Sequence, residues 1–436
     1  MKSVNQYVMK DSGVQWIGQV PEHWEVCRLG AIFKENVILN TEEREVNALQ
    51  FKLGEIISKS KGNSKYIPIS LSGYNIVEPN VIMINGLNLS FDFISQRVAL
   101  VKERGVITST YIAIAPSSCV EDKNTTSRYV CYLLKAYDAC KVLHAMGRGL
   151  RAILSYSVLS KIPIYLPPLS EQRAIADWLD AKCADIDAAI ELQQRMIDKL
   201  KAYKTAVIHQ AVTKGLDKNA NLKDSGVQWI GEVPKHWEVC HLGSIFKENV
   251  RLNTEEKETN ALQFRLGEII SKSKGNSKYI PISLSGYNIV EPNVIMINGL
   301  NLSFDFISQR VALVKERGVI TSTYIAIAPS CYIEDENTTS RYACYLLKAY
   351  DTCKVLHSMG RGLRATLSYS TLSKMPILLP PLTEQRSIAD WLDAKCADID
   401  ATIALKEQKQ EKLKEYKKTI IFEYVTGKKQ VANINK

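Results

Sequence analysis

Apolar residues follow two periodicities along this chain, and each periodicity predicts its own kind of element. Short runs rich in β-branched and aromatic residues, partly alternating with polar ones, are separated by Gly, Asn and Pro clusters. This pattern predicts strands joined by turns. The runs are KYIPISL (65–71), VIMI (81–84), RVALV (97–101) and VITSTYIAIAP (106–116).

A helical periodicity replaces this alternation after residue 120. Ser127 is a candidate N-cap for a helix that runs to about His144, because apolar residues then recur every three or four positions. One face of this predicted helix carries Val130, Leu133, Leu134, Tyr137 and Cys140.

A much longer helix is predicted after the two prolines of KIPIYLPPL (161–169). Ser170 is its candidate N-cap, and Glu171 lies in the first turn, where the helix dipole favours an acid. No Pro or Gly intervenes before about Val212. At about 1.5 Å per residue, roughly 40 residues give a rod of about 60 Å.

The apolar residues of this long helix form a seven-residue repeat, which is typical of a coiled-coil seam. The repeat consists of Leu179, Ile186, Leu200 and Val207, interrupted by Gln193, with Ile175, Ile190 and Ile197 as the neighbouring stripe. A second helix from Thr383 has the same spacing, with Leu392, Ile399, Leu413 and Ile420, and Lys406 at the polar interruption.

These elements occur twice because the chain is an internal duplication. Residues 53–117 recur unchanged at 266–330, and residues 11–204 align without gaps at an offset of 213. A period this long is a full domain with a connector rather than a solenoid unit. Two identical surfaces imply two identical ligands, or one ligand that is itself two-fold.

The expected fold class is therefore α+β, with two mixed α/β domains joined by two long helices. The two seams are natural partners, and antiparallel pairing as a coiled coil would relate the halves by a pseudo-two-fold axis with one domain at each end of the rod. The alternative is that each seam pairs with another subunit.

Charge placement points to a polyanionic ligand. The net charge is +10, and two equivalent segments, 124–165 and 337–378, each carry six basic residues and one acid. Concentrated positive charge at two equivalent places is the footprint expected for duplex DNA. The alternative is a solvated basic face.

Composition bears on the state of the cysteines and on the expected location of the protein. The ten cysteines lie mostly at matched positions without a C-x-x-C pair, so we interpret them as reduced core residues rather than metal ligands or disulfides. No apolar run is long enough to cross a bilayer, and the N-terminus lacks the apolar region of a secretory signal. A cytoplasmic location is expected.

Several motifs together resemble a known family. Residues 147–190, GRGLRAILSYSVLSKIPIYLPPLSEQRAIADWLDAKCADIDAAI, recur in similar form at 360–403, and each half opens with W-I-G-x-V-P-x-H-W-E-V. The combination of L-P-P-L-[ST]-E-Q-R, I-D-x-x-I and two-fold repetition resembles the specificity subunit of type I restriction-modification systems. The resemblance covers essentially the whole chain.

This resemblance implies an organisation and partners. Residues 1–168 and 217–381 would be target recognition domains, residues 169–216 a helical spacer, and residues 382–436 a second spacer with the C-terminal tail. Each target domain would read one half of a split sequence on double-stranded DNA, with the paired helices setting the gap. Two DNA methyltransferase subunits would dock on the helices, and two endonuclease subunits would join them.

Many members of this family carry two different target domains, whereas the two domains here share an identical core. We therefore expect inverted half-sites around a nonspecific spacer. Differences such as Ile38 against Arg251 and Val120 against Ile333 are expected to have little effect on base reading. A separation of about 60 Å would span between one and two turns of B-DNA, at about 34 Å per turn.

Candidate DNA-binding residues are basic and amide side chains in the predicted loops, since phosphates need cations and base edges need bidentate groups. Arg148 and Arg151 in the G-R-G-L-R loop are the strongest candidates, with pairing to Asp138 or a helix end as the alternative. For the others the alternatives are a solvated loop and ordinary turn chemistry. The full set is Lys59, Lys61, Asn63, Lys65, Asn85, Asn88, Gln96, Arg97, Arg148 and Arg151, with Lys272, Lys274, Asn276, Lys278, Asn298, Asn301, Gln309, Arg310, Arg361 and Arg364 in the second copy.

Other motif residues are assigned structural roles. Glu171, Gln172 and Arg173, with their counterparts in the second copy, are expected to start the helix and pack on the domain. Trp178 and Trp391 are interpreted as core or subunit contacts rather than base-stacking platforms.

No catalytic residues are predicted. The chain lacks G-x-x-x-x-G-K-[ST], the N-P-P-[YF] or D-P-P-Y tetrad of amino-methyltransferases, and H-E-x-x-H. A noncatalytic subunit without cofactor or metal is expected, with S-adenosylmethionine, ATP and Mg²⁺ belonging to partner subunits. The alternatives are a stand-alone DNA-binding regulator without a methyltransferase partner and a coiled-coil scaffold.

Overall fold

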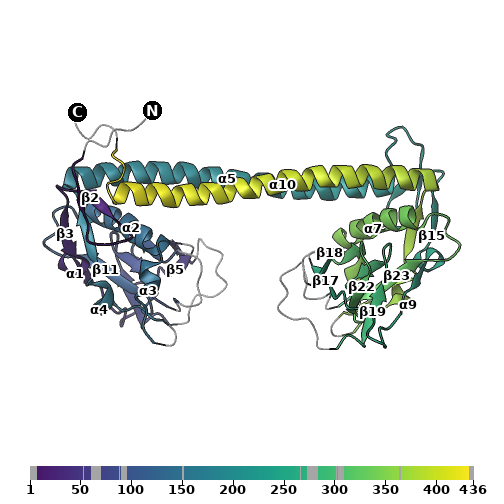
Figure 1. Ribbon diagram of the computed structural model, residues 1–436, viewed down its shortest axis with the longest axis horizontal. Coiled ribbons are helices and arrows are strands. Elements are labelled where there is room, and N and C mark those ends of the chain that lie inside the picture. The colour runs from purple at the N-terminus through teal and green to yellow at the C-terminus, as the bar shows by residue number, and fades with distance from the viewer. Residues whose placement is uncertain are drawn as a thin grey trace. The chain divides into compact units, whose positions relative to one another are not determined.

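A computed structural model describes residues 7–52, 54–59, 70–87, 89, 96–149, 152–265, 267–272, 283–300, 302, 309–362 and 365–431 (Figure 1). The chain forms two compact units: Met1–Gln193 with Gln408–Lys436, and Gln194–Glu407. Each unit therefore contains one mixed α/β domain, the first part of one long helix and the last part of the other.

The first unit contains short strands and helices, some of which Figure 1 labels. They are β1 (Met9–Asp11), β2 (Gln19–Pro21), β3 (Glu25–Arg28), α1 (Leu29–Ile32), β4 (Phe33–Glu35), β5 (Leu49–Lys52), β6 (Glu55–Ser58), β7 (Tyr74–Val77), β8 (Ile82–Ile84), β9 (Val98–Leu100), β10 (Gly105–Thr108), β11 (Ile112–Pro116), α2 (Lys123–Ala139), α3 (Val142–Ala145), α4 (Tyr156–Leu159), β12 (Pro163–Leu166) and the start of α5 (Leu169–Lys214).

The second unit repeats the same order. Its elements are β13 (Leu222–Asp224), β14 (Glu232–Pro234), β15 (Glu238–His241), α6 (Leu242–Ile245), β16 (Phe246–Glu248), β17 (Leu262–Arg265), β18 (Glu268–Ser271), β19 (Tyr287–Val290), β20 (Ile295–Ile297), β21 (Val311–Leu313), β22 (Gly318–Thr321), β23 (Ile325–Pro329), α7 (Glu336–Thr352), α8 (Val355–Ser358), α9 (Tyr369–Leu372), β24 (Pro376–Leu379) and the start of α10 (Leu382–Val425).

A four-stranded antiparallel sheet, β4-β11-β8-β9, forms the centre of the first domain. Alternate residues of a strand face opposite sides of a sheet. Ile82 and Ile84 of β8 join α2 in one core cluster, whereas Met83 between them joins the core beneath the β5–β6 hairpin. The second domain has the equivalent sheet, β16-β23-β20-β21.

The strand predictions match the structure unevenly. VIMI and RVALV contain β8 and β9, but 106–116 forms two strands, β10 and β11, with a turn at Ser109. Most of KYIPISL lies outside the described residues, and Ser70 and Leu71 are not in a strand.

The first predicted helix is displaced at both ends. Its N-cap is Asp122, whose carboxylate accepts a hydrogen bond from the backbone N–H of Thr125 at 3.0 Å. Ser127 is fully buried instead of capping, so that prediction was wrong. The helix ends at Ala139, because Lys141 has φ +60° and starts the separate short helix α3. The predicted apolar face is buried, except that Cys140 lies just beyond the helix and is exposed.

Each unit pairs its two helical segments in antiparallel fashion. In the first unit Trp178 stacks on Tyr424 at 4.0 Å between ring centroids, and Asp187 pairs with Lys417 at 2.6 Å. In the second unit Lys406 contacts the Met196 sulfur, and Lys204 pairs with Asp400 at 2.6 Å. Positions rise along α5 as they fall along α10, which confirms the predicted antiparallel pairing within the chain.

The predicted seam is buried at most of its positions. Leu179, Ile186, Leu392 and Ile399 are each no more than 5% exposed, while Leu200 and Leu413 are half-buried. The polar interruptions differ: Gln193 is buried, and Lys406 is half-buried with its ammonium on Met196. The predicted fold class, two mixed α/β domains joined by a paired-helix connector in a duplicated chain, is confirmed.

None of the helices in the described ranges combines the length and the apolar character that a bilayer crossing requires.

Candidate nucleic-acid interface

Half of the predicted DNA-binding residues lie where the structure describes them. These are Lys59, Asn85, Gln96, Arg97 and Arg148, with Lys272, Asn298, Gln309, Arg310 and Arg361 in the second unit. The others lie outside the described residues: Lys61, Asn63, Lys65, Asn88, Arg151, Lys274, Asn276, Lys278, Asn301 and Arg364.

The buried Arg97 side chain holds the backbone of the turn after β8 by hydrogen bonds. Its side chain is almost fully buried, and its Nη1 donates to the backbone carbonyls of Asn85 at 2.8 Å and Leu87 at 2.7 Å. Arg310 makes the same two bonds, to Asn298 and Leu300. A buried guanidinium bonded in this way fixes the backbone of the turn rather than presenting its donors at the surface.

Asn85 stabilises the same turn through its side chain. Its Oδ1 accepts a hydrogen bond from the backbone N–H of Leu87 at 3.2 Å, and its own N–H donates to the Arg97 carbonyl at 2.8 Å. This is the side-chain-to-backbone bond that Asn commonly makes in turns. Asn298 repeats it with Leu300.

Arg148 lies at the base of a tight loop. Its backbone exchanges two hydrogen bonds with Ile153, at 3.0 and 2.9 Å, and Gly149 between them has φ +77°. The Arg148 side chain is exposed, and across the described ranges it has no ion pair. Arg361 occupies the same place opposite Thr366.

The two loops are bonded to each other. Leu154 donates its N–H to the Gly86 carbonyl at 2.9 Å, and Leu89 donates to the Ala152 carbonyl at 3.1 Å. A Cβ at Gly86 would lie 2.8 Å from the Leu154 carbonyl oxygen, so only glycine permits this approach. The structure thus brings Arg148 and the Asn85 turn, which the buried Arg97 holds in place, into one loop surface, which we call the candidate interface.

Asp138 supports this surface from below, and sequence reasoning missed its role. Its Oδ2 accepts the backbone N–H of Arg97 at 2.9 Å, and its Oδ1 lies 3.7 Å from His144 Nδ1. Burial raises the pKa of the equivalent Asp351. The sequence did offer one indication of this role, because Asp138 is the one acid in 124–165, a segment that also holds six basic residues.

Lys59 and Gln96 lie beside the β5–β6 hairpin. Lys59 follows β6, with its ammonium 6.0 Å from the centre of the Tyr74 ring. Gln96 is exposed and lies against the hairpin turn, 3.7 Å from where a Cβ would be at Gly54. Gln96 therefore extends the candidate interface toward the hairpin, while Lys59 lies at the hairpin's other end.

The residues of the L-P-P-L-[ST]-E-Q-R motif hold the helix start on the domain, as expected. Glu171 accepts from Trp24 Nε1 at 3.2 Å and from Tyr7 at 2.7 Å, and it pairs with His23 at 2.9 Å. Burial, together with the hydrogen bond to Glu171 and its negative charge, raises the pKa of Tyr7. Gln172 donates to the Pro167 carbonyl. In the second unit Glu384 binds Trp237 and His236.

Trp178 packs between helices, as its stacking on Tyr424 shows, whereas Trp391 in the second unit is 41% exposed. Within the described ranges, no group of three or more His, Cys, Asp or Glu side chains is arranged to hold a metal ion.

Comparison with known proteins identifies the relatives of this architecture. The family model described as the type I restriction modification DNA specificity domain matches twice, at residues 21–202 and 234–415. These two matches cover most of the chain and fall on its two repeats.

Individual relatives agree. The type I restriction enzyme MjaVIII specificity subunit of Methanocaldococcus jannaschii is 24% identical over 437 residues, covering 96% of this chain and 95% of the relative. A solved chain from a study of complex assembly and conformational transition of the type I R-M system is 14% identical with a TM-score of 0.65, covering 94% of this chain and 99% of that one. At this identity the second likeness shows a shared fold.

Proposed function

The chain belongs to the family of type I restriction-modification DNA specificity proteins, and on that premise we propose that it is a noncatalytic subunit that directs DNA methyltransferase subunits to a split recognition site. The observation that carries the proposal is the double family match on an internally duplicated chain. Residues 1–168 and 217–381 would act as the target recognition domains, with 169–216 and 382–436 as the helical spacers.

The candidate interface is the proposed DNA-reading surface of each domain. Arg148 and Arg361, which are exposed on a loop whose base is held by two backbone bonds, would contact phosphates or base edges. We assign Arg97 and Arg310 a positioning role instead of a direct contact, because both are almost fully buried. Asn85 and Asn298 would hold the turn and are not assigned base contacts.

The identity of the two cores argues for equal half-sites. Residues 53–117 and 266–330 do not differ, and the printed bonds of the Asn85 turn recur around Asn298. Two identical target recognition domains, connected by an antiparallel helix pair, would recognise inverted copies of one short sequence. The proposed site is therefore a palindrome interrupted by a nonspecific spacer.

The long helices provide the proposed docking surface for two methyltransferase subunits. On α5, Met196 and Tyr203 are 39% and 49% exposed and lie seven residues apart, so they share a face that the seam does not use. On α10, Leu405 and Tyr416 are 66% and 47% exposed. Of these, Tyr203 and Tyr416 occupy matched positions of the two repeats, so an exposed aromatic side chain recurs on both helices and fits a partner surface. Endonuclease subunits would join this complex.

Methyl transfer in a reconstituted complex tests the proposal. The candidate methyltransferase is incubated with genomic DNA and labelled S-adenosylmethionine, with and without this chain. We expect incorporation only when the chain is present. Tight, specific DNA binding by the chain alone, together with no association with the methyltransferase, would contradict the proposal and favour a stand-alone regulator.

A further inference from the structure

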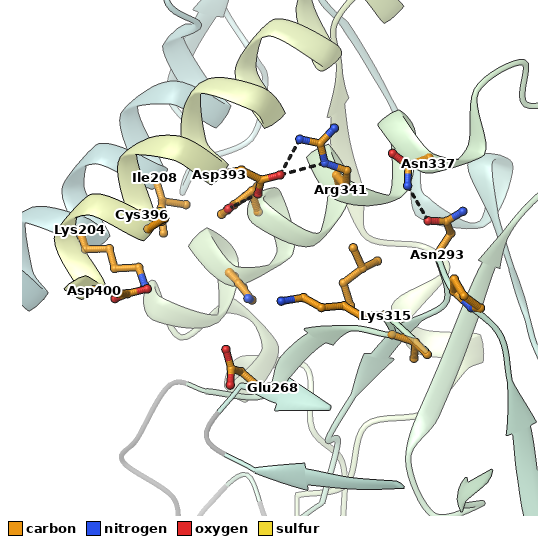
Figure 2. A pocket seen from close by; sticks show the side chains of 16 residues that line it. Lys204, Ile208, Glu268, Asn293, Lys315, Asn337, Arg341, Asp393, Cys396 and Asp400 are labelled. Carbon is orange, nitrogen blue, oxygen red and sulfur yellow. Dashed lines mark hydrogen bonds and ion pairs between the residues drawn. The ribbon is translucent and has the colours of Figure 1, made fainter. Parts of the chain in front are cut away.

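A polar cleft of about 610 Å³ lies in the second unit, between the target domain and the paired helices (Figure 2). Its lining comes from several elements: Arg341 and Lys348 from α7, Lys315 from the segment after β21, Lys204 from α5, Asp393 and Asp400 from α10, and Glu268 from β18. Four cations thus face three acids.

Two of these acids are already neutralised by neighbouring cations. Arg341 donates to Asp393 at 2.5 Å and to Asp390 at 2.7 Å, and Lys204 pairs with Asp400 at 2.6 Å. Tyr345 donates a further hydrogen bond to Asp393 at 2.6 Å. The acids on α10 therefore have little remaining capacity to bind the other lysines.

Lys315 and Lys348 supply the remaining positive charge. Neither has an ion pair within the part of the chain that the structure describes, and the remaining lining acid is the exposed Glu268. Figure 2 shows the Lys315 side chain reaching into the cleft above Glu268. Both ammonium groups act on one buried thiol: burial raises the pKa of Cys344, and the two lysines partly offset that rise.

The first unit repeats this arrangement. Lys102 and Lys135 both offset the raised pKa of the buried Cys131 thiol, and Arg128 binds Asp177 and Asp180 as Arg341 does its own two acids. The hydrogen bond from Asn337 to Asn293 at 3.0 Å, on the cleft wall, recurs between Asn124 and Asn80 at 3.0 Å.

We propose that this cleft, and the equivalent residues of the first unit, bind the phosphodiester backbone of DNA beside each half-site, through the pairs Lys315 with Lys348 and Lys102 with Lys135. A phosphodiester accepts hydrogen bonds and carries one negative charge, which suits two ammonium groups with amide donors nearby. A cleft of about 610 Å³ has room for a phosphate together with its sugar. This inference rests on the proposed function, because that function supplies the DNA.

The position of the cleft favours DNA over an acidic protein segment. Glu268 begins β18 directly after Gly267, and a Cβ at Gly267 would lie 3.7 Å from Gln309. Gln309 borders the buried Arg310, so the rim of the cleft adjoins the candidate interface. DNA held at the base-reading loops would therefore run close to Glu268 and the cleft that it lines.

The salt dependence of DNA binding tests this site. The full chain in complex with its methyltransferase is titrated with a duplex that carries the methylated motif and with an unrelated duplex, at several salt concentrations. The double variant Lys135→Gln/Lys348→Gln should reduce the slope of log K against log salt by about 1.8, or about 0.9 per lost phosphate contact. Both duplexes should lose affinity equally, because phosphates carry no sequence information.

Matched variants separate the site from general charge loss. Lys199→Gln/Lys412→Gln removes the same charge from exposed, equivalent positions on the two long helices and should leave the slope unchanged. Lys135→Arg/Lys348→Arg should retain the wild-type slope. Lys102→Gln/Lys315→Gln, at exposed positions, provides a second test if the first variant folds poorly.

Two results would overturn the inference alone. One is an unchanged slope in both lysine variants while the complex still binds DNA. The other is loss of methyltransferase association without a change in slope, which would assign the cleft to an acidic protein segment. Failure of the wild-type complex to bind either duplex would overturn the proposed function and this inference with it.

Discussion

Asp138 accepts the backbone N–H of Arg97 at 2.9 Å, and through this bond the carboxyl-terminal part of α2 fixes the strand that carries the candidate interface. Arg97 in turn donates to the carbonyls of Asn85 and Leu87. A buried acid is thereby linked, through one residue, to the loop that we propose reads DNA.

Removing this acid should loosen the loop surface. Asp138→Ala leaves a buried N–H without its acceptor, which costs about 1–3 kcal/mol of unfolding free energy. We expect the Asp138→Ala/Asp351→Ala variant to unfold at lower denaturant concentration and to bind DNA more weakly. Asp138→Asn/Asp351→Asn keeps an acceptor and should lose less. Equal stability of the alanine variant and the wild type in urea titrations would contradict this role.

The close approach of the two loops predicts a glycine requirement. A Cβ at Gly86 would lie 2.8 Å from the Leu154 carbonyl oxygen, and one at Gly299 would lie 3.0 Å from that of Leu367. Gly86→Ala/Gly299→Ala should push the loops apart, at a cost of about 1–3 kcal/mol, and weaken DNA binding in gel-shift titrations.

Gly73→Ala/Gly286→Ala is the matched control for this glycine pair. A Cβ at Gly73 or Gly286 would meet no atom within 4 Å. The control should bind DNA like the wild type. Equal DNA affinities for the two double variants would show that the loop approach does not matter for binding.

Substituting the exposed tyrosines of the long helices should weaken methyltransferase docking while leaving the fold intact. Tyr203→Asp/Tyr416→Asp places a charge in the proposed methyltransferase surface. Because both side chains are about half exposed, folding should be little affected. Association measured by analytical ultracentrifugation should weaken at least tenfold, since aromatic residues dominate interface energies. Val26→Asp/Val239→Asp, at exposed positions on β3 and β15, should associate normally.

Acid should destabilise both domains through their helix caps. The backbone N–H of Thr125, the Thr125 hydroxyl and Arg173 all lower the pKa of Asp122, and the equivalent interactions lower that of Asp335 to about 2. A lowered carboxyl pKa gives stability that is present above the unfolded value of about 4 and is lost as pH falls toward the folded value.

We therefore expect the unfolding free energy to decline between about pH 4 and pH 2, with Asp122→Ala/Asp335→Ala losing about 1 kcal/mol per cap at neutral pH. The variant should show a shallower acid decline than the wild type in urea titrations at each pH. Parallel pH curves for the two proteins would exclude the caps as a source of the acid sensitivity.

Local sequence pattern predicted the elements whose periodicity was strict. The heptads around Leu179 and Leu392 specified the seam because a seven-residue spacing leaves one face for burial. The cap at Ser127 was wrong, because Asp122 five residues earlier offers a carboxylate to the Thr125 N–H, and the apolar face alone does not mark where the helix begins. The change from α2 to α3 depends on Lys141 adopting a positive φ, which sequence pattern does not reveal.

The candidate site was only partly predictable for a related reason. Arg97 was selected as a basic residue near a turn, yet its burial depends on contacts with Asn85 and Asp138, which are 12 and 41 positions away along the chain. Arg148 in the glycine loop was chosen on flexibility and charge, and its exposure keeps it in the proposal. The cleft lysines come from separate elements, so no local motif marks them.

Single-molecule sequencing of DNA methylated by this chain with its methyltransferase tests the central claim most directly. The identical cores predict a methylated motif consisting of two inverted copies of one short sequence, separated by a spacer of fixed length and any composition. An asymmetric split motif, or a continuous motif without a spacer, would contradict the account of two equivalent domains that each read one half-site.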